Sequence, residues 1–205
     1  MIVPENINTL IFDFGGVIYN INIQIGINNL KEIGFTDADE YIGHFAHNGF
    51  FVQWENGEIS VEEFRNEIRK RCVNVVTDQD IDDAWCSIML EIPDERIDLL
   101  QKLQKKYRLL LLSNTNPLHI EVSTKKELTK RGLTMDDLFD KCYYSYEVGA
   151  VKPGEEIFLK LLQDAGVKAE NCLFLDDGEK NIETAKKLGF NTYLVTPGQS
   201  LNFLL

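Results

Sequence analysis

Long apolar runs, an excess of basic residues and clustered cysteines are all missing from this sequence. No apolar segment reaches the roughly 20 residues that a membrane-spanning helix needs. Lysine and arginine number 21 against 33 aspartates and glutamates, which gives a net charge of −12. This charge disfavours nucleic acids, which are bound by neutralising their phosphates, and it disfavours anionic membrane surfaces.

A secretion signal and a cysteine framework are also missing. The first residues contain no basic stretch followed by an apolar core and a cleavage site. Cys72, Cys86, Cys142 and Cys172 show no metal-ligand or redox spacing, so we interpret them as buried thiols. We therefore expect a soluble, cytoplasmic protein with no nucleic-acid, membrane or protein partner. Its 205 residues, 44% of them hydrophobic, are enough to bury a sizeable core.

The most informative feature present is the segment 10–18, in which an apolar strand runs into Asp13 and then into Gly15 and Gly16. An aspartate at this point lies at the carboxyl end of a buried strand, where open α/β sheets bind their ligands. Glycines let the backbone turn sharply and bring amide N–H groups close to an anion. The segment is typical of a nucleophile in a phosphate cradle, although alone it also fits a strand that ends in an Asx turn.

Three later segments favour the functional interpretation. An apolar run at 107–112 ends in Ser113 and Asn114, and Lys152 precedes a proline. The apolar run 172–175 ends in Asp176 and Asp177. Paired acids after an apolar strand pack poorly but suit a hard divalent cation such as Mg²⁺, which prefers carboxylate oxygens.

The ordered set of Asp, Ser-Asn, Lys-Pro and Asp-Asp resembles the haloacid dehalogenase superfamily of Mg²⁺-dependent phosphohydrolases. The resemblance covers 13–189 and implies that Asp13 is the nucleophile and that Ser113 and Lys152 hold the phosphoryl group. It also implies a small phosphorylated metabolite as substrate and an aspartyl-phosphate intermediate. For the phosphate, the resemblance also implies contacts from the N–H groups of Phe14 and Gly15 and from Asn114. For Mg²⁺, it implies direct contacts from Asp13, the Gly15 carbonyl and Asp177, with Asp176 in the outer shell.

The sequence departs from the family pattern at Gly15, where most phosphatases of the superfamily carry an aspartate that acts as general acid. Losing that acid removes roughly 10²–10⁴ in rate for a poor leaving group. A stabilised leaving group, as in a sugar 1-phosphate, needs less protonation, so we consider this class of substrate. Alternatively a residue of the inserted segment, His44, His47 or Glu55, supplies the proton.

Apolar runs at 7–13, 107–112, 141–146, 171–175 and 191–195 predict strands, and helical stretches separate the last four. This alternation predicts an α/β fold, a three-layer doubly wound parallel sheet in the order 5-4-1-2-3. The segments 25–33, 38–46, 61–72 and 78–90 read as helices with no convincing strand between them, and Ser60 with Glu63 forms a capping box. We therefore predict an α/β core domain at 1–18 and 92–205 with a helical cap domain inserted at 19–91.

The side chains of the inserted segment allow several interpretations. His44 and His47 have helical spacing without a third ligand nearby, which favours packing or exposure over metal binding. An aromatic cluster at 41–54 is a candidate wall of the cleft. Glu55, Glu58, Glu62 and Glu63 read as a solvated approach to a helix.

Two rival functions share this fold. A 2-haloacid dehalogenase uses the same aspartate and lysine without a metal, and the Asp176–Asp177 pair argues against it. A non-catalytic binding module derived from such an enzyme would be expected to have lost more than the one group at Gly15.

Overall fold

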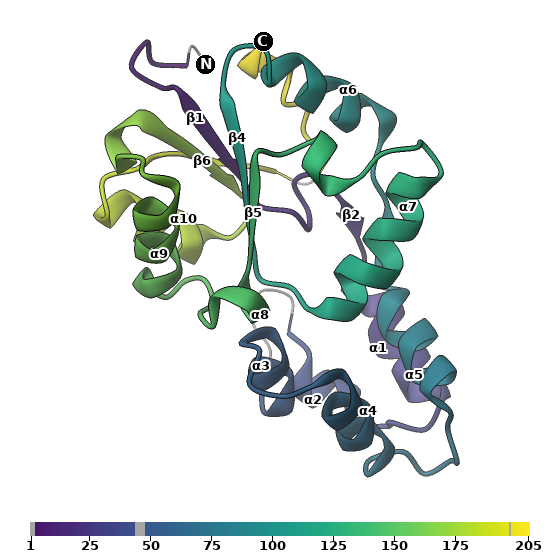
Figure 1. Cartoon of the computed structure of the whole chain (residues 1–205). Helices are drawn as coiled ribbons and strands as arrows, with labels where there is room; N and C mark the ends of the chain where they lie inside the picture. The colour runs from purple at the N-terminus through teal and green to yellow at the C-terminus, as the bar shows by residue number, and fades with distance from the viewer. Residues whose placement is uncertain (1–2, 44–47, 197) are drawn as a thin grey trace.

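The computed structural model describes residues 3–43, 48–196 and 198–205 and has a five-stranded parallel sheet at its centre (Figure 1). The sheet order is β5-β4-β1-β6-β7, so β1, the strand that leads to Asp13, is the central strand. The strands are β1 (Thr9–Phe12), β4 (Arg108–Ser113), β5 (Lys141–Tyr144), β6 (Cys172–Asp176) and β7 (Asn191–Leu194). When these five strands are numbered along the chain, their order in the sheet is 3-2-1-4-5. Read from the other edge, this is 5-4-1-2-3, so the predicted order is confirmed.

Side chains of the central strands alternate between two apolar layers, as the strand period of two requires. Leu10 and Phe12 of β1 face one layer, whereas Ile11 faces the other. Helices α6 (Asp94–Leu103) and α7 (Lys125–Thr129) cover the first face. Helices α9 (Glu155–Ala165) and α10 (Glu179–Lys187) cover the second, on the opposite side of the sheet in Figure 1. Burial on both faces explains why these strands read as continuous apolar runs.

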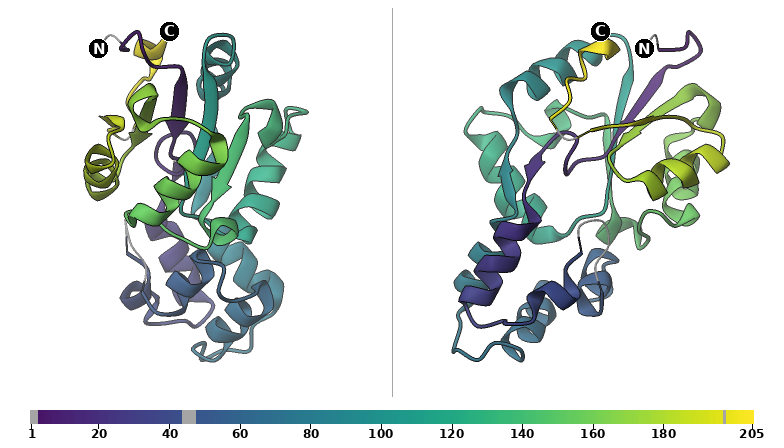
Figure 2. Two further views of the ribbon diagram at one scale, coloured as in Figure 1. Left: turned by 60° about the vertical axis from the view of Figure 1, so that its left-hand side comes forward. Right: turned by 180° about the vertical axis from the view of Figure 1, so that it is seen from behind.

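A helical unit follows β1 and lies beyond the carboxyl edge of the sheet (Figures 1 and 2). Its helices are α1 (Ile23–Glu32), α2 (Ala38–Tyr41), α3 (Phe50–Glu55), α4 (Val61–Arg69) and α5 (Asp78–Cys86). They pack around their own buried aromatic cluster, which includes Phe51, Trp54, Phe64 and Trp85. The predicted capping box is present, since the Glu63 N–H donates to Ser60 Oγ over 3.2 Å and the Ser60 N–H donates to Glu63 Oε2 over 2.8 Å.

The expectation of no strand in this unit is wrong. Two short strands, β2 (Asn20–Ile21) and β3 (Met89–Glu91), pair antiparallel where the chain enters and leaves the helical unit. The helix expected at 78–90 therefore ends at Cys86. Strands this short carry no detectable alternation, and their pairing partner lies far away in the sequence.

Shorter elements complete the fold. They are the π-helix Leu118–Thr124, the short helix α8 (Ser145–Val148) and the 3₁₀ turns Met135–Asp137, Ala169–Asn171 and Asn202–Leu204. Among the described residues, no helix is both long enough and apolar enough to cross a membrane.

Candidate active site

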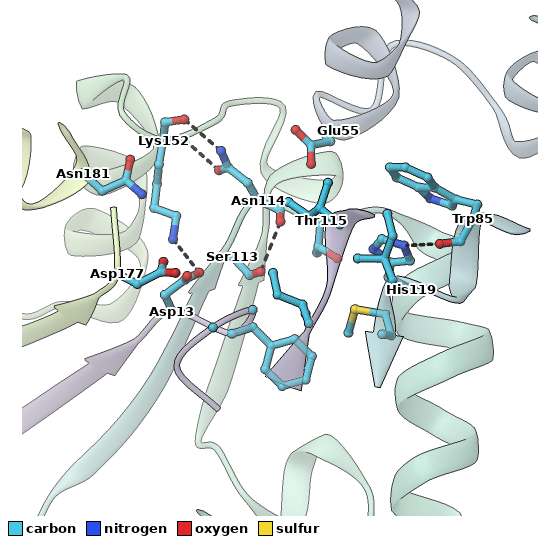
Figure 3. A pocket seen from close by; sticks show the side chains of 17 residues that line it. Asp13, Glu55, Trp85, Ser113, Asn114, Thr115, His119, Lys152, Asp177 and Asn181 are labelled. Carbon is cyan, nitrogen blue, oxygen red and sulfur yellow. Dashed lines mark hydrogen bonds and ion pairs between the residues drawn. The ribbon is translucent and has the colours of Figure 1, made fainter. Parts of the chain in front are cut away.

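The polar residues that end the central strands meet at one cavity of about 240 Å³ between the sheet edge and the helical unit (Figure 3). Of the residues that the resemblance assigns to phosphate or Mg²⁺, those that line it are Asp13, Phe14, Gly15, Ser113, Asn114, Lys152 and Asp177. Asp176 does not line the cavity, but it accepts a hydrogen bond from the ammonium group of Lys152. The structure thus brings together side chains that are up to 164 positions apart in the sequence.

Lys152 is the centre of the cluster. Its Nζ donates to Asp13 Oδ1 over 2.6 Å and to Asp176 Oδ2 over 2.7 Å, and all three side chains are buried. Burial alone would lower the pKa of Lys152, but the carboxylates of Asp13 and Asp176 outweigh it and hold the pKa well above its usual value. The lysine is therefore a fixed positive charge beside Asp13.

Asp176 accepts three hydrogen bonds and has no solvent exposure. Besides Lys152, the Gly178 N–H donates to its Oδ1 over 2.7 Å and Asn181 Nδ2 donates to the same oxygen over 2.9 Å. A Cβ on Gly178 would lie 2.8 Å from Asn181 Nδ2, so a larger residue there would displace this arrangement. Asp176 consequently orients Lys152 and anchors the start of α10.

Asp13, Asp176 and Asp177 form a group of carboxylates whose oxygens lie within 4.8 Å of one another. Burial raises the pKa of Asp13 to about 7, the two neighbouring carboxylates add to the rise, and Lys152 opposes it. The cluster contains more carboxyl groups than ammonium groups, which favours the binding of a cation. Oxygen donors in this number and with this charge fit a divalent cation such as Mg²⁺.

The turn after β1 is built for a close approach to Asp177. Gly16 has φ +79°, and a Cβ there would lie 2.4 Å from Asp177 Oδ2. The Phe14 carbonyl accepts the N–H groups of Ile18 and Tyr19 over 2.9 and 2.8 Å, which closes the turn. Only glycine at position 16 keeps the carboxylate where it lies.

The loop after β4 is locked by side-chain hydrogen bonds. Asn114 Nδ2 donates to the Lys152 carbonyl and the Lys152 N–H donates to Asn114 Oδ1, both over 2.8 Å. The Thr115 N–H donates to Ser145 Oγ over 3.0 Å, and that hydroxyl donates to the Thr115 carbonyl over 3.1 Å. The Asn114 side chain is thus engaged with the Lys152 backbone, so it positions the lysine.

The helical unit contributes Glu55 and Trp85 to the cavity wall. Burial raises the pKa of Glu55 to about 8, against a smaller lowering by Lys152. The interpretation of Glu55 as a solvated residue is therefore wrong, because the end of α3 turns it toward the cavity (Figure 3). His44 and His47 lie outside the described residues.

Other residues were not singled out for the site by sequence reasoning. His119 follows β4 and stacks on Trp85 of α5 with ring centroids 4.9 Å apart, and both line the cavity. No spacing in the sequence connects them, because each lies in a different unit. Of the aromatic cluster expected to line the cleft, Phe50, Phe51 and Trp54 are instead buried inside the helical unit.

Comparison with known proteins supports this interpretation of the geometry. The model of the haloacid dehalogenase-like hydrolase family matches residues 7–189. The chain belongs to the haloacid dehalogenase-like hydrolases. This assignment confirms the resemblance that the ordered motifs indicate, and those motifs are the residues that meet at the cavity.

Relatives within the haloacid dehalogenase-like hydrolases are similar over almost the whole chain. A D-ribitol-5-phosphate phosphatase from Bacteroides thetaiotaomicron is 35% identical over 187 residues, 91% of each chain. A crystal structure of a HAD family enzyme from the same species, an aspartate-to-alanine mutant in complex with magnesium and inorganic phosphate, has 38% identity and a TM-score of 0.93 over 97% of this chain and 98% of that one. A predicted HAD-like family hydrolase from Porphyromonas gingivalis has 39% identity and a TM-score of 0.87, with 94% and 93% covered.

Proposed function

We propose that this hydrolase is a Mg²⁺-dependent phosphatase that removes the phosphoryl group of a small metabolite through an aspartyl-phosphate on Asp13. The observation that carries the proposal is the buried Asp13–Lys152–Asp176 cluster, with contacts of 2.6 and 2.7 Å, beside Asp177 in one cavity. A fixed ammonium next to a carboxylate at a strand end suits attack on an anionic phosphate, which a carboxylate alone would repel.

Mg²⁺ would be held by Asp13, by the main-chain carbonyl of Gly15 and by Asp177, with Asp176 in the outer shell. The three hydrogen bonds that Asp176 already accepts support its outer position. When bound, the ion supplies positive charge that draws the carboxylate and the phosphate together and stabilises the transferring oxygens.

Side chains and main-chain groups of the protein attack phosphorus and bind the phosphoryl oxygens. Asp13 attacks phosphorus, while Lys152 and Ser113 hold the phosphoryl oxygens and the N–H groups of Phe14, Gly15 and Asn114 complete the cradle. The unit at 19–91 serves as a cap over the core at 1–18 and 92–205. By covering the cavity it excludes water and strengthens each of these electrostatic contacts.

The substrate we propose is a small polyol or sugar that carries a terminal phosphate group. A cavity of about 240 Å³ is smaller than the roughly 300–1,000 Å³ of pockets for drug-sized ligands, so it suits a small metabolite. The similarity to a D-ribitol-5-phosphate phosphatase favours a linear polyol phosphate over the sugar 1-phosphate suggested by Gly15 alone. The cytoplasmic location and the absence of a protein partner stay predictions.

The test is phosphate release from D-ribitol 5-phosphate and from sugar phosphates, with Mg²⁺ and with EDTA. We expect turnover that depends on Mg²⁺ and that Asp13→Asn abolishes. Halide release from a 2-haloacid without metal would favour a dehalogenase. Tight binding of a phosphate ester with no turnover would favour a non-catalytic module.

A further inference from the structure

Gly15 leaves the reaction without the acid that a poor leaving group needs, and the cavity contains another candidate. We propose that Glu55, from the last turn of α3 in the cap, is the general acid that protonates the leaving oxygen and the general base that then activates water. This inference rests on the proposed phosphatase function.

The place of Glu55 in the cavity fits this role. In an in-line displacement the leaving oxygen departs on the side of phosphorus opposite the attacking oxygen. Asp13 attacks from the sheet edge, so the leaving group points toward the cap. Glu55 enters the cavity from the cap, across from Asp13 and Lys152, with its carboxyl group directed inward (Figure 3).

The cap holds Glu55 in place through the residues on either side of it. Trp54 is buried and stacks on Phe64 with ring centroids 4.6 Å apart, which fixes the last turn of α3. Gly57 then packs against α8 of the core: it has φ +72°, and a Cβ there would lie 2.0 Å from the Tyr146 carbonyl oxygen. Contact with a core helix therefore sets how far Glu55 reaches into the cavity.

The surroundings of Glu55 favour its protonated form. Among the described residues, the charged or titratable groups that line the cavity with it are Asp13, Lys152, Asp177 and His119. Burial raises the pKa of Glu55 to about 8 and Lys152 opposes the rise, so the carboxyl group carries its proton near neutral pH.

His119 is the competing donor on the cavity wall, and its ring nitrogens are already engaged. Its Nδ1 lies 3.2 Å from Asn116 Nδ2 and its Nε2 lies 3.4 Å from the Trp85 carbonyl oxygen. Since Asn116 Nδ2 is a donor, Nδ1 accepts and the proton sits on Nε2, directed at Trp85. This leaves Glu55 as the better placed acid.

Glu55 transfers one proton in each of the two steps of the reaction. In the first, the bond between Asp13 Oδ and phosphorus forms as the bond from phosphorus to the leaving oxygen breaks, and that oxygen keeps the electron pair and takes the proton of Glu55. The alcohol departs and Glu55 becomes a carboxylate. In the second, the carboxylate takes one proton of a water whose oxygen attacks phosphorus, which releases phosphate, regenerates the Asp13 carboxylate and returns the proton to Glu55.

The experiment compares Glu55→Gln with Glu62→Gln on two phosphate esters. Gln keeps the shape of Glu55 but has no acidic proton, whereas Glu62 is an exposed residue of the first turn of α4 and serves as the matched control. We compare kcat/KM, which reports the transfer to Asp13 and not the later hydrolysis that both esters share. With D-ribitol 5-phosphate, an alkyl phosphate, we expect Glu55→Gln to lower kcat/KM roughly 10²–10⁴-fold. With p-nitrophenyl phosphate, whose leaving group departs unprotonated, we expect kcat/KM to change only a few-fold, and Glu62→Gln to match the wild type on both.

The pH profile separates acid catalysis from substrate binding. Because a donor is active only while protonated, wild-type kcat/KM on the alkyl ester should fall above the pKa of Glu55, and this alkaline limb should be absent in Glu55→Gln. Equal losses of kcat/KM on both esters, or no loss on either, would overturn the assignment of Glu55. Failure of the proposed function would look different, since the wild type would then hydrolyse neither ester.

Discussion

Replacing Gly57 by alanine should separate the cap's contact with the core from its internal stability. Gly57 has φ +72°, and a Cβ at this position would lie 2.0 Å from the Tyr146 carbonyl oxygen in α8. Gly132 has a similar φ of +66° with nothing within 4 Å of its would-be Cβ. Alanine therefore meets the same backbone strain at both positions, but it meets a steric overlap only at position 57.

The magnitudes follow from these two terms. An alanine in the left-handed region costs roughly 1–2 kcal/mol, which lowers Tm by about 2–8 °C in a chain of this size. Cβ atoms in folded proteins essentially never lie closer than 3.0 Å to such an atom. An alanine at position 57 therefore requires α3 and α8 to separate by about 1 Å. Because the obstacle is main chain, a rotamer change cannot relieve it. A misplacement of about 1 Å in a catalytic group costs up to roughly 10²-fold in rate.

The assay is kcat on an alkyl phosphate together with Tm for both variants. We expect Gly132→Ala to lose thermal stability and keep wild-type kcat, and Gly57→Ala to lose at least as much stability and most of its kcat. Equal kcat values for the two variants would refute the argument that the Gly57 contact positions Glu55.

Three further predictions follow from the site. Asp177→Asn should abolish Mg²⁺-dependent turnover, whereas Asp176→Asn should weaken it roughly 10–100-fold, the range for outer-shell partners, as measured by titrating activity with Mg²⁺. Burial raises the pKa of Glu55 from 4.5 to about 8 in the folded chain, so between these pH values the folded chain holds a proton that the unfolded chain has lost. The free energy of unfolding of the wild type, measured by urea titration relative to Glu55→Gln, should therefore fall as the pH rises through this range. In Gly15→Asp the three atoms nearest to the new Cβ all belong to the Ile21 side chain, with its flexible Cδ1 at 3.1 Å, so the chain should fold. An alkyl phosphate should then again be hydrolysed when this change is added to Glu55→Gln, and no recovery of activity would contradict a step limited by the missing acid.

The sheet could be predicted because its strands are local apolar runs. The polar cluster at the cavity could be predicted because each of its residues directly follows or borders such a run. Asp13, Ser113 and the Asp176–Asp177 pair all take their position from the end of a strand. Parallel strands bring such ends to one edge, so the sequence order of the motifs was sufficient to place them together.

The cap could be predicted only as a helical unit. Whether Glu55 faces solvent or the cavity depends on how α3 docks on α8, a contact across units that leaves no trace in local periodicity. The same holds for the stacking of His119 on Trp85 and for the pairing of β2 with β3. These features arise from contacts between distant segments, each of which has an ordinary local pattern.

Rapid quenching of the enzyme during turnover tests the central claim most directly. With Mg²⁺ and an alkyl phosphate, mass spectrometry of the quenched and digested protein should find a phosphoryl group on the peptide that contains Asp13. The modification should disappear with EDTA and in Asp13→Asn. Turnover that continues with no phosphoryl group on this peptide, or that survives Asp13→Asn, would contradict the account.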